Sequence, residues 1–330
     1  MREVSKVRRL LFIRTDRLGE TLLNLPAIAA LKRALPQASI TLLAHPDLAS
    51  LLAGSPVIDE VLAYQTASPG QWGVRAWELG RMLKPSRFDL AIVSNPKKEL
   101  HAGVWLAGIP CRVGYGRKWG GLLTHRIEDR KALGERHEVE YNLDLLRVLG
   151  LPVADLQWPL PAFEQERVRV SQLLDELGVK SSDDLIAVHP WTSNPQKQWS
   201  VERYAALIRQ FLAGSSSRVA VIGGPEEQSR AGRLALPSER AHDLVGRLTL
   251  RQLAVFFTRC RLLLSGDSGP VHLAAAVGTP TIVLFGTSDP ATGPRRWGPW
   301  GTKHTVIWKP SMETLGVDEV WRAIERYLEP

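Results

Sequence analysis

Short apolar runs, each followed by a stretch with helical spacing, most constrain what this chain can fold into. Runs of this kind lie at residues 9–15, 40–44 and 89–93, and the helical spacing after the first run predicts a helix over residues 20–34. Such runs are typical of strands buried on both faces, and the helices between them make neighbouring strands parallel. The sequence therefore predicts an α/β protein built on parallel sheets.

The alternation begins again after a proline-rich stretch that contains Pro152, Pro159 and Pro161. A helix expected near residues 137–149 ends at Gly150 just before this stretch, as helices commonly do. We predict two domains, residues 1–158 and 159–330, with the amphipathic last helix as a candidate to pack back on the first domain. In the second half we expect strands at 185–189, 219–222, 262–265 and 281–285, and helices at 201–212, 226–236 and 269–277.

Composition excludes several classes of protein. Hydrophobic residues make up 44% of the chain and charged residues 23%, which indicates a globular protein. No apolar run approaches the roughly 18 residues that span a bilayer, and the apolar part of the first run, LLFI, is shorter than the roughly 7–15 residues of a secretory signal. We expect a cytoplasmic protein whose only cysteines, Cys111 and Cys260, are reduced and structural, without a metal site.

The net charge of +8 is uneven, because residues 1–155 carry 22 Lys/Arg against 16 Asp/Glu. A basic first half favours an anionic partner. Nucleic acid is excluded as that partner, since the patterns of its known binders are missing. The anionic partner is therefore expected to be an acidic substrate or a membrane surface. Seven basic residues fall within 25 positions: Arg112, Arg117, Lys118, Arg126, Arg130, Lys131 and Arg136. They form either a solvated surface or a site that binds an acidic acceptor. For the acceptor site the candidates are Arg117, Lys118 and Arg126.

The loop after the first predicted strand reads RTDRLGE and carries two carboxylates. Glu20 at the helix start fits either a carboxylate that complements the helix dipole or a general base. Asp16 is a second acid in the same loop. The dinucleotide fingerprint G-x-G-x-x-G is absent from this loop.

Three segments of the second half could bind phosphate or ribose. Thr192, Ser193 and Lys197 follow a predicted strand and could face phosphate oxygens, although a solvated loop lysine fits equally. Glu226 and Glu227 follow a Gly-Gly turn, where an acid can bind ribose hydroxyls or complement a helix dipole.

The stretch Gly266-Asp267-Ser268-Gly269-Pro270 is the most specific in the chain. Pro270 suits a first helical turn, with Asp267 or Ser268 as its cap. The helix that starts here would offer free N–H groups to a diphosphate. His272 in its first turn is either a packed residue or one that faces the same loop.

Four segments, in order and at the expected spacing, resemble glycosyltransferase family 9, the ADP-heptose:lipopolysaccharide heptosyltransferases. They are RTDRLGETLLNLPAIAALK, HEVEYNLDLLRVLGL, HPWTSNPQKQWSVERYAALI and GDSGPVHLAAAVGTPTIVLFG. The resemblance implies a GT-B fold of two facing Rossmann-like domains with parallel sheets. It implies inverting transfer, without metal or cofactor, from ADP-heptose bound mainly by the second domain to an inner-core lipopolysaccharide acceptor bound mainly by the first. Peripheral contact with the cytoplasmic face of the inner membrane would follow.

The resemblance also implies roles for single residues. Glu20 falls where the family has the aspartate of a Gly-Asp pair and would be the general base. Because glutamate is one methylene longer, Asp16 stays open as an alternative base. Lys197 and Thr192 would contact the donor diphosphate, and Glu226, or else Glu227, would bind the ribose. The nucleotide loop would comprise Asp267, Ser268, Gly269 and His272.

Two rival functions remain at this stage. One is a GT-B enzyme for another nucleotide sugar, either a transferase or an epimerase. The other is a non-catalytic sugar-nucleotide-binding protein, which the acid at position 20 and Lys197 argue against.

Overall fold

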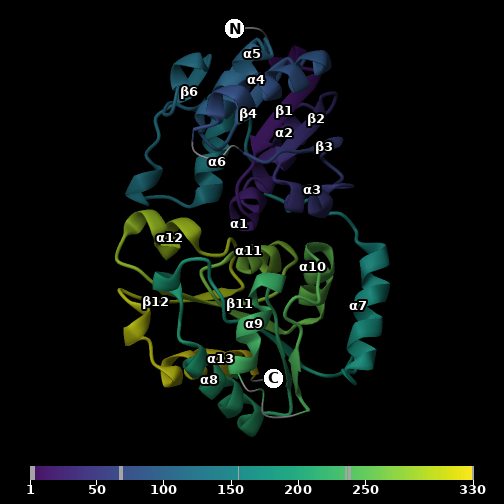
Figure 1. The fold of residues 1–330 in the computed structure, drawn as a ribbon, viewed down its shortest axis with the longest axis vertical. Coiled ribbons are helices and arrows are strands. Elements are labelled where there is room, and N and C mark those ends of the chain that lie inside the picture. Colours follow the sequence, from purple (N-terminus) through teal and green to yellow (C-terminus); the bar gives the residue numbers. More distant parts are fainter. Residues whose placement is uncertain (1–3, 67–69, 155, 235, 237–238, 329–330) are drawn as a thin grey trace. The chain divides into compact units, whose positions relative to one another are not determined.

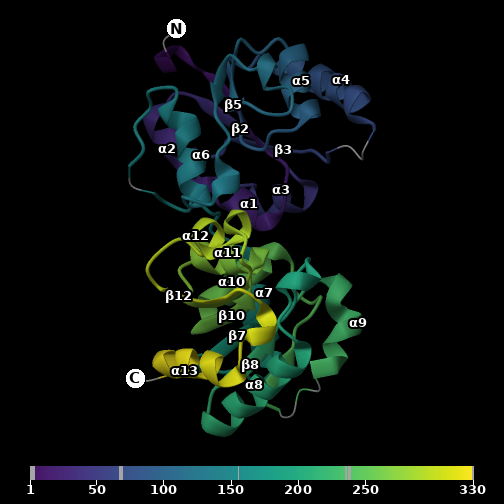
Figure 2. The ribbon, with the colours of Figure 1, turned by 90° about the vertical axis from the view of Figure 1, so that its left-hand side faces the viewer.

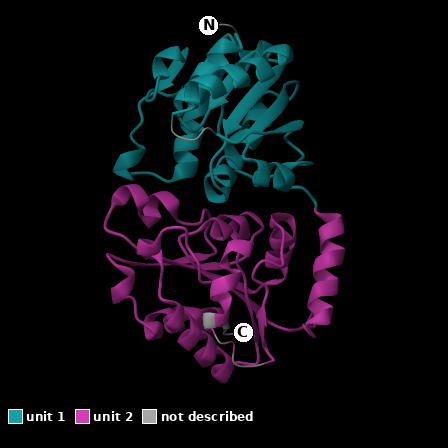
Figure 3. Ribbon diagram, viewed as in Figure 1, with its two compact units in different colours: residues 1–162 teal, residues 163–330 magenta. Residues whose placement is uncertain are grey.

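The computed structural model describes residues 4–66, 70–154, 156–234, 236 and 239–328 (Figure 1). The chain divides into two compact units, residues 1–162 and 163–330 (Figure 3). The division falls after Ala162, whereas the predicted boundary lies after Trp158.

Unit 1 is built on a parallel six-stranded sheet with the strand order β3-β2-β1-β4-β5-β6. Its strands are β1 (Arg9–Arg14), β2 (Ser39–Ala44), β3 (Glu60–Ala63), β4 (Leu90–Val93), β5 (Cys111–Tyr115) and β6 (His125–Ile127). Its helices are α1 (Leu18–Leu22), α2 (Leu25–Ala34), α3 (Pro46–Leu52), α4 (Trp72–Leu83), α5 (Lys98–Leu106) and α6 (Glu138–Arg147).

The two faces of this sheet are covered by different helices, because successive side chains of a strand point to opposite sides. Leu11, Ile13 and Val93 belong to one apolar cluster with residues of α4 and α5. Figure 2 shows α4 and α5 on one face of the sheet and α2 and α6 on the other. Both faces are therefore buried, as the apolar runs predicted.

The single helix expected from residue 20 to 34 is wrong. The structure has two helices, α1 and α2, which are separated at Leu23 and Asn24. Pro26 has no N–H to donate to the carbonyl of Leu22, and its ring would clash with that carbonyl in a continuous helix. The chain therefore stops and restarts, with Pro26 in the first turn of α2.

Unit 2 repeats the topology in a second parallel six-stranded sheet, with the order β12-β11-β10-β7-β8-β9. Its strands are β7 (Leu185–His189), β8 (Arg218–Val221), β9 (Ala241–Asp243), β10 (Leu262–Gly266), β11 (Thr281–Gly286) and β12 (His304–Lys309). Its helices are α7 (Glu164–Glu176), α8 (Val201–Gly214), α9 (Gln228–Ala231), α10 (Leu250–Arg259), α11 (Gly269–Ala276), α12 (Pro294–Trp297) and α13 (Val317–Leu328).

One helix of unit 2 differs from the prediction. The helix expected over 226–236, of which residue 235 lies outside the described part, is wrong: a turn at Pro225–Glu227, the short α9 and a turn at Gly232–Leu234 replace it. Gly232, a poor helix former, stands where α9 ends. The last helix, α13, packs within unit 2, where the Trp321 and Phe211 rings meet at 6.2 Å.

Each sheet has a point at which the strand order reverses. In unit 1 the chain builds β2 and β3 on one side of β1 and then β4 on the other, and β7 has the same position between β8 and β10. Ligands of open α/β sheets bind outside the carboxyl ends of the strands at such a switch point. The ends of β1 and β4 and the ends of β7 and β10 are therefore the places to examine.

Candidate active site

Asp16 lies at the unit 1 switch point, held by groups from β1 and β4. Its carboxylate accepts a hydrogen bond from Asn95 Nδ2 at 2.8 Å and lies 3.3 Å from both Arg14 Nη2 and Lys97 Nζ. Burial acts to raise the pKa of Asp16, but Arg14, Lys97 and Asn95 outweigh burial, and the pKa is lowered. A carboxylate stabilised in this way is a weak proton acceptor.

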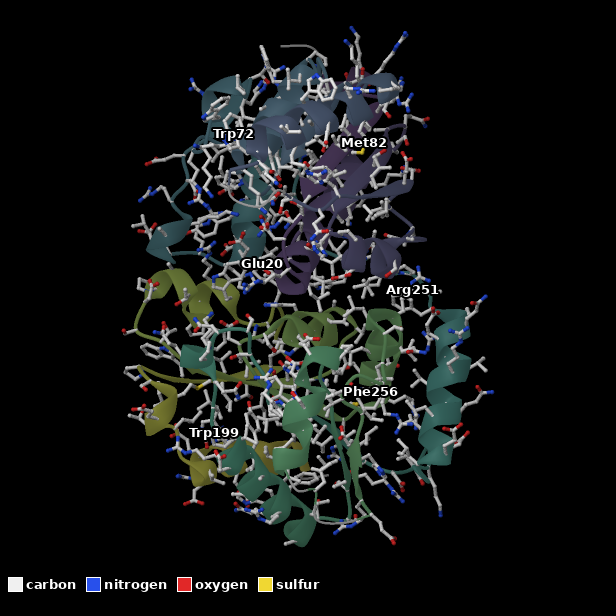
Figure 4. The ribbon with its side chains drawn as sticks, viewed as in Figure 1. Glu20, Trp72, Met82, Trp199, Arg251 and Phe256 are labelled. Carbon is white, nitrogen blue, oxygen red and sulfur yellow. The ribbon has the colours of Figure 1, made fainter. Side chains whose placement is uncertain are left out.

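Glu20, by contrast, lies in the only full turn of α1, where Figure 4 labels it. The residue is partly exposed, and among the residues that the structure describes nothing pairs with its carboxylate. Its backbone carbonyl accepts a hydrogen bond from Asn24 Nδ2 at 2.7 Å. Of the two candidate bases, Glu20 is thus the one whose carboxylate is open to a substrate hydroxyl.

A buried polar network underlies α1. Asn24 accepts a hydrogen bond from Ser94 Oγ at 2.6 Å, and Asn142 Nδ2 donates to the carbonyl of Leu23 at 3.0 Å. Both asparagines and Ser94 are fully buried. The network therefore fixes the end of α1 against β4 and α6.

The network contains a carboxylate that sequence reasoning did not single out. Glu138 on α6 is 0% exposed, with its Oε1 2.6 Å from Lys131 Nζ and 3.7 Å from Arg14 Nη1. The available signal was the spacing of Glu138 and Asn142, which places two polar residues four apart on a buried helix face. Lys131, predicted within a basic surface cluster, is instead 5% exposed.

At the unit 2 switch point, an imidazole and two hydroxyls form a compact cluster. His189 Nδ1 lies 3.1 Å from Ser265 Oγ and 3.2 Å from Ser268 Oγ, and the two hydroxyls are 2.9 Å apart. Burial lowers the pKa of His189 to about 4. The imidazole is therefore neutral at pH 7, and the cluster carries no charge.

An ion pair joins two residues that the sequence assigned to the nucleotide site. Lys197 Nζ, in the turn after β7, contacts a carboxylate oxygen of Asp267, the residue after β10. Thr192 lies close to this pair. A Cβ placed on Gly266, the residue before Asp267, would lie 3.0 Å from the methyl group of Thr192. The Thr192 hydroxyl donates to the carbonyl of Asn194 at 2.8 Å, and Ser193 is exposed.

Helix α11 begins next to this ion pair. Ser268 is its N-cap residue in an extended conformation, but its side chain makes no capping hydrogen bond and is directed to His189 and Ser265. Ser268 thus occupies the predicted cap position but does not cap the helix through its side chain. The Val271 N–H donates to the Ser268 carbonyl at 3.2 Å and Pro270 has no N–H, so among the described residues the Gly269 N–H is left for another acceptor. His272 in this helix is buried, which agrees with the packed alternative.

The two glutamates after the Gly-Gly turn have different surroundings. Glu227 accepts a hydrogen bond from the Gly224 N–H and has a 12% exposed side chain, and burial raises its pKa. Glu226 is exposed and folds back over Gly224. Glu227 thus closes the turn, while Glu226 is free to contact a ligand.

The basic segment of unit 1 is not a uniform charged surface. Arg117 lies 2.6 Å from Asp129, and Arg136 lies 2.8 Å from Asp144. Arg112 donates to the carbonyls of Leu122 and Ile109. Lys118, in a left-handed conformation with φ 47°, and Arg126 on β6 are exposed.

The described part of the chain holds neither a metal-ligand cluster nor a helix that could span a membrane. There, no group of three or more His, Cys, Asp or Glu side chains could hold a metal ion. Within the same residues, every helix is too short or too polar to cross a bilayer. Cys111 and Cys260 are both free thiols.

Two doubly wound parallel sheets, each with polar groups at its switch point, are the architecture of a GT-B protein. The model of the family described as glycosyltransferase family 9 (heptosyltransferase) matches residues 76–319. The chain belongs to that family.

Relatives extend over nearly the whole chain. A putative glycosyltransferase of Haemophilus influenzae is 28% identical and covers 98% of this chain and 97% of its own. Lipopolysaccharide heptosyltransferase 3 of Escherichia coli K12 is 26% identical over 88% of this chain and 85% of its own. The solved structure of the E. coli ADP-heptose lps heptosyltransferase II superposes with a TM-score of 0.80 at 25% identity, over 97% of this chain and 98% of that one.

Proposed function

We propose that this protein transfers heptose from ADP-heptose to a hydroxyl group of an inner-core lipopolysaccharide acceptor, with inversion at the anomeric carbon. The family and the names of the E. coli relatives support this choice of donor and acceptor. The observation that carries the proposal is the Lys197–Asp267 ion pair beside the open N-terminus of α11.

On the donor side, negative charge grows on the leaving diphosphate during transfer. An ammonium group has three N–H donors, and Asp267 accepts from Lys197 while leaving donors for phosphate oxygens. The Gly269 N–H and the positive end of the α11 dipole add to this site. Preorganised donors of this kind stabilise developing charge without a metal ion.

Other residues of unit 2 complete the proposed donor site. Ser193 and Thr192 lie on the loop that carries Lys197, and Ser268 precedes α11. Glu226 is proposed as the acid that binds the ribose hydroxyls, because Glu227 already closes its own turn. His272 would act by packing α11 and not by touching the nucleotide.

On the acceptor side, Glu20 is the proposed general base. It removes the proton from the acceptor hydroxyl, whose oxygen attacks the anomeric carbon as ADP leaves. Asp16, held by Arg14 and Lys97, keeps its charge and orders the loop. Arg117, Lys118 and Arg126 are proposed to bind acidic groups of the acceptor, since arginine pairs with carboxylates and phosphates in a bidentate way.

Donor screening tests the proposal. ADP-heptose, UDP-sugars and GDP-sugars are offered with a deacylated inner-core acceptor, with and without EDTA. We expect transfer from ADP-heptose alone, at a rate that EDTA leaves unchanged. Transfer from another nucleotide sugar overturns the donor, and conversion of a UDP-sugar with no acceptor present indicates an epimerase.

A further inference from the structure

Helix α4 exposes three large apolar side chains. Val74, Trp77 and Met82 are 65%, 54% and 42% exposed. Their spacing places them on one side of the helix. Leu79 and Leu83 on the other side are buried. Figure 4 labels Trp72 and Met82 at the two ends of this helix.

Helix α5 continues this surface. A Cβ on Gly80 would lie 2.7 Å from the Cβ of Leu106, so the two helices touch there, and Figures 1 and 2 show them side by side. The last turn of α5 exposes Trp105 and Leu106 by 51% and 41%. Large exposed apolar surfaces mark sites that bind a partner or a membrane. We name this surface the tryptophan face: Val74, Trp77, Met82, Trp105 and Leu106.

A third exposed tryptophan borders the start of α4. The ring of Trp119 is 48% exposed and meets Trp72 edge-on at 4.6 Å. Trp119 and its neighbour Lys118 both have positive φ, at 70° and 47°. Non-glycine residues adopt this conformation only where the surrounding structure enforces it, commonly at functional sites. The fold thus holds an exposed aromatic ring in place at a cost in backbone strain.

Positive charge accompanies these aromatic rings. The segment from Trp72 to Arg87 contains four basic residues and one acidic residue. The Arg81 guanidinium lies 4.7 Å from the centre of the Trp77 ring, and Lys98 Nζ lies 5.8 Å from that of Trp72. Tryptophan flanked by arginine and lysine suits the boundary between lipid headgroups and acyl chains, and anionic lipids attract the cations.

We propose that the tryptophan face docks on an anionic membrane surface, with its rings at headgroup level and Arg81 and Lys84 against lipid phosphates. The inference deepens the proposed function, on which it rests for a membrane-borne acceptor. It assigns the contact to α4 and α5 of unit 1, helices that carry none of the residues proposed for donor binding or for the general base.

Vesicle sedimentation tests the assignment on the full chain. Vesicles of phosphatidylglycerol mixed with phosphatidylcholine are compared with phosphatidylcholine alone. Trp77→Ser combined with Trp105→Ser should lower the partition coefficient on the anionic vesicles by roughly tenfold or more. Arg81→Gln combined with Lys84→Gln should lower it by about fivefold per charge, on anionic vesicles only. Trp308→Ser is the matched control, because Trp308 is a 53% exposed tryptophan on β12 of unit 2.

Three outcomes overturn the inference: unchanged vesicle binding by the double tryptophan variant, an equal loss in Trp308→Ser, or a wild-type dimer in sedimentation velocity that the tryptophan changes disperse. The last result would make the face a contact between copies. Transfer to a deacylated, soluble acceptor should be unaffected by the double variant. Vesicle binding without transfer from ADP-heptose contradicts the proposed function alone, and transfer without vesicle binding contradicts this inference alone.

Discussion

The two switch points share a topology and differ in their electrostatics. In unit 1, Arg14, Lys131 and Glu138 bring charges into the protein interior, and Asp16 is held between two cations. In unit 2, the buried His189 is neutral and contacts the hydroxyls of the buried Ser265 and the half-buried Ser268, and the Lys197–Asp267 ion pair is partly exposed.

The difference indicates two uses of polar groups. Buried charges that are already paired fix backbone, because moving either partner leaves a charge without compensation. A partly exposed ammonium next to an open N–H group can still change partners when an anion arrives. The site of unit 1 is therefore the stiffer of the two, and Glu20 lies on the backbone that the buried charges fix. The site of unit 2 is the more adaptable one.

The largest expected effect is on turnover. Glu20→Gln should keep nucleotide binding and lower kcat by about 10²–10⁴-fold, the usual contribution of a general base. Asp16→Asn should lower kcat less, because the lowered pKa of Asp16 makes it a poor base. Steady-state kinetics on both variants decide the matter, and the reverse order would move the role to Asp16.

Next is the stability of unit 1. Glu138→Ala should cost about 3–5 kcal/mol in the free energy of unfolding, because the buried Lys131 loses its carboxylate contact at 2.6 Å and the buried Arg14 loses one of its two carboxylate neighbours. Urea denaturation measures the change, with the two units allowed separate transitions. The matched control is Glu135→Ala, which removes an exposed ion pair with Arg130 and should cost at most about 1 kcal/mol. Equal costs would show that unit 1 is not held by its buried charges.

Substitutions in the donor site should change the catalytic rate and leave the free energy of unfolding almost unchanged. Lys197→Ala and Asp267→Ala should each lower kcat/KM for the donor by about 10²-fold. If Asp267 orients Lys197, the double variant should lose little more than either single one. Lys303→Ala removes an exposed lysine of the same unit as a control. Wild-type rates in both single variants would refute the phosphate role.

Acid should also distinguish the two sites. The pKa of His189 is about 4 in the folded protein against 6.5 for a free histidine, so the unfolded chain binds more protons between these values. The contribution of the neutral imidazole to the free energy of unfolding is fully present above pH 6.5. As the pH falls from 6.5 towards 4, the free energy of unfolding should decrease by about 1.4 kcal/mol per pH unit. His189→Gln should flatten that slope, whereas Asp16→Asn should alter it only below about 3.8. An unchanged slope in His189→Gln would show that the imidazole is not buried as a neutral group.

The smallest effect concerns the acceptor. Replacing Arg117, Lys118 and Arg126 with alanine should raise the acceptor KM several-fold and leave the donor KM unchanged. The effect should shrink with salt, because exposed charges are screened over about 8–10 Å near physiological ionic strength. Kinetics at two salt concentrations measure both constants. An acceptor KM that does not move would leave these residues as solvated surface.

The sequence by itself determined the fold class and the positions of the central strands. The runs that became β1, β2, β4, β7, β8, β10 and β11 are buried on both faces, and a buried strand needs apolar residues throughout. It also pointed to the glycine-rich turn before α11. The strands that were missed, β3, β5, β6, β9 and β12, lie towards the sheet edges, where partial exposure weakens the apolar signal.

Only the tertiary structure decided which charged residues are buried in ion pairs and which are open to a ligand. Asp16 and Glu20 are both acidic residues of the same loop, and the sequence alone does not distinguish their roles. In the structure the carboxylate of Asp16 contacts Arg14, Lys97 and Asn95, whereas that of Glu20 is open. Lys131 and Lys118 belong to one basic segment, yet only the first is buried against Glu138. Asn95 lies 79 positions from Asp16, and Glu138 lies 124 positions from its second cation, Arg14. Such distant residues meet only when the chain folds, so local sequence patterns do not contain these contacts.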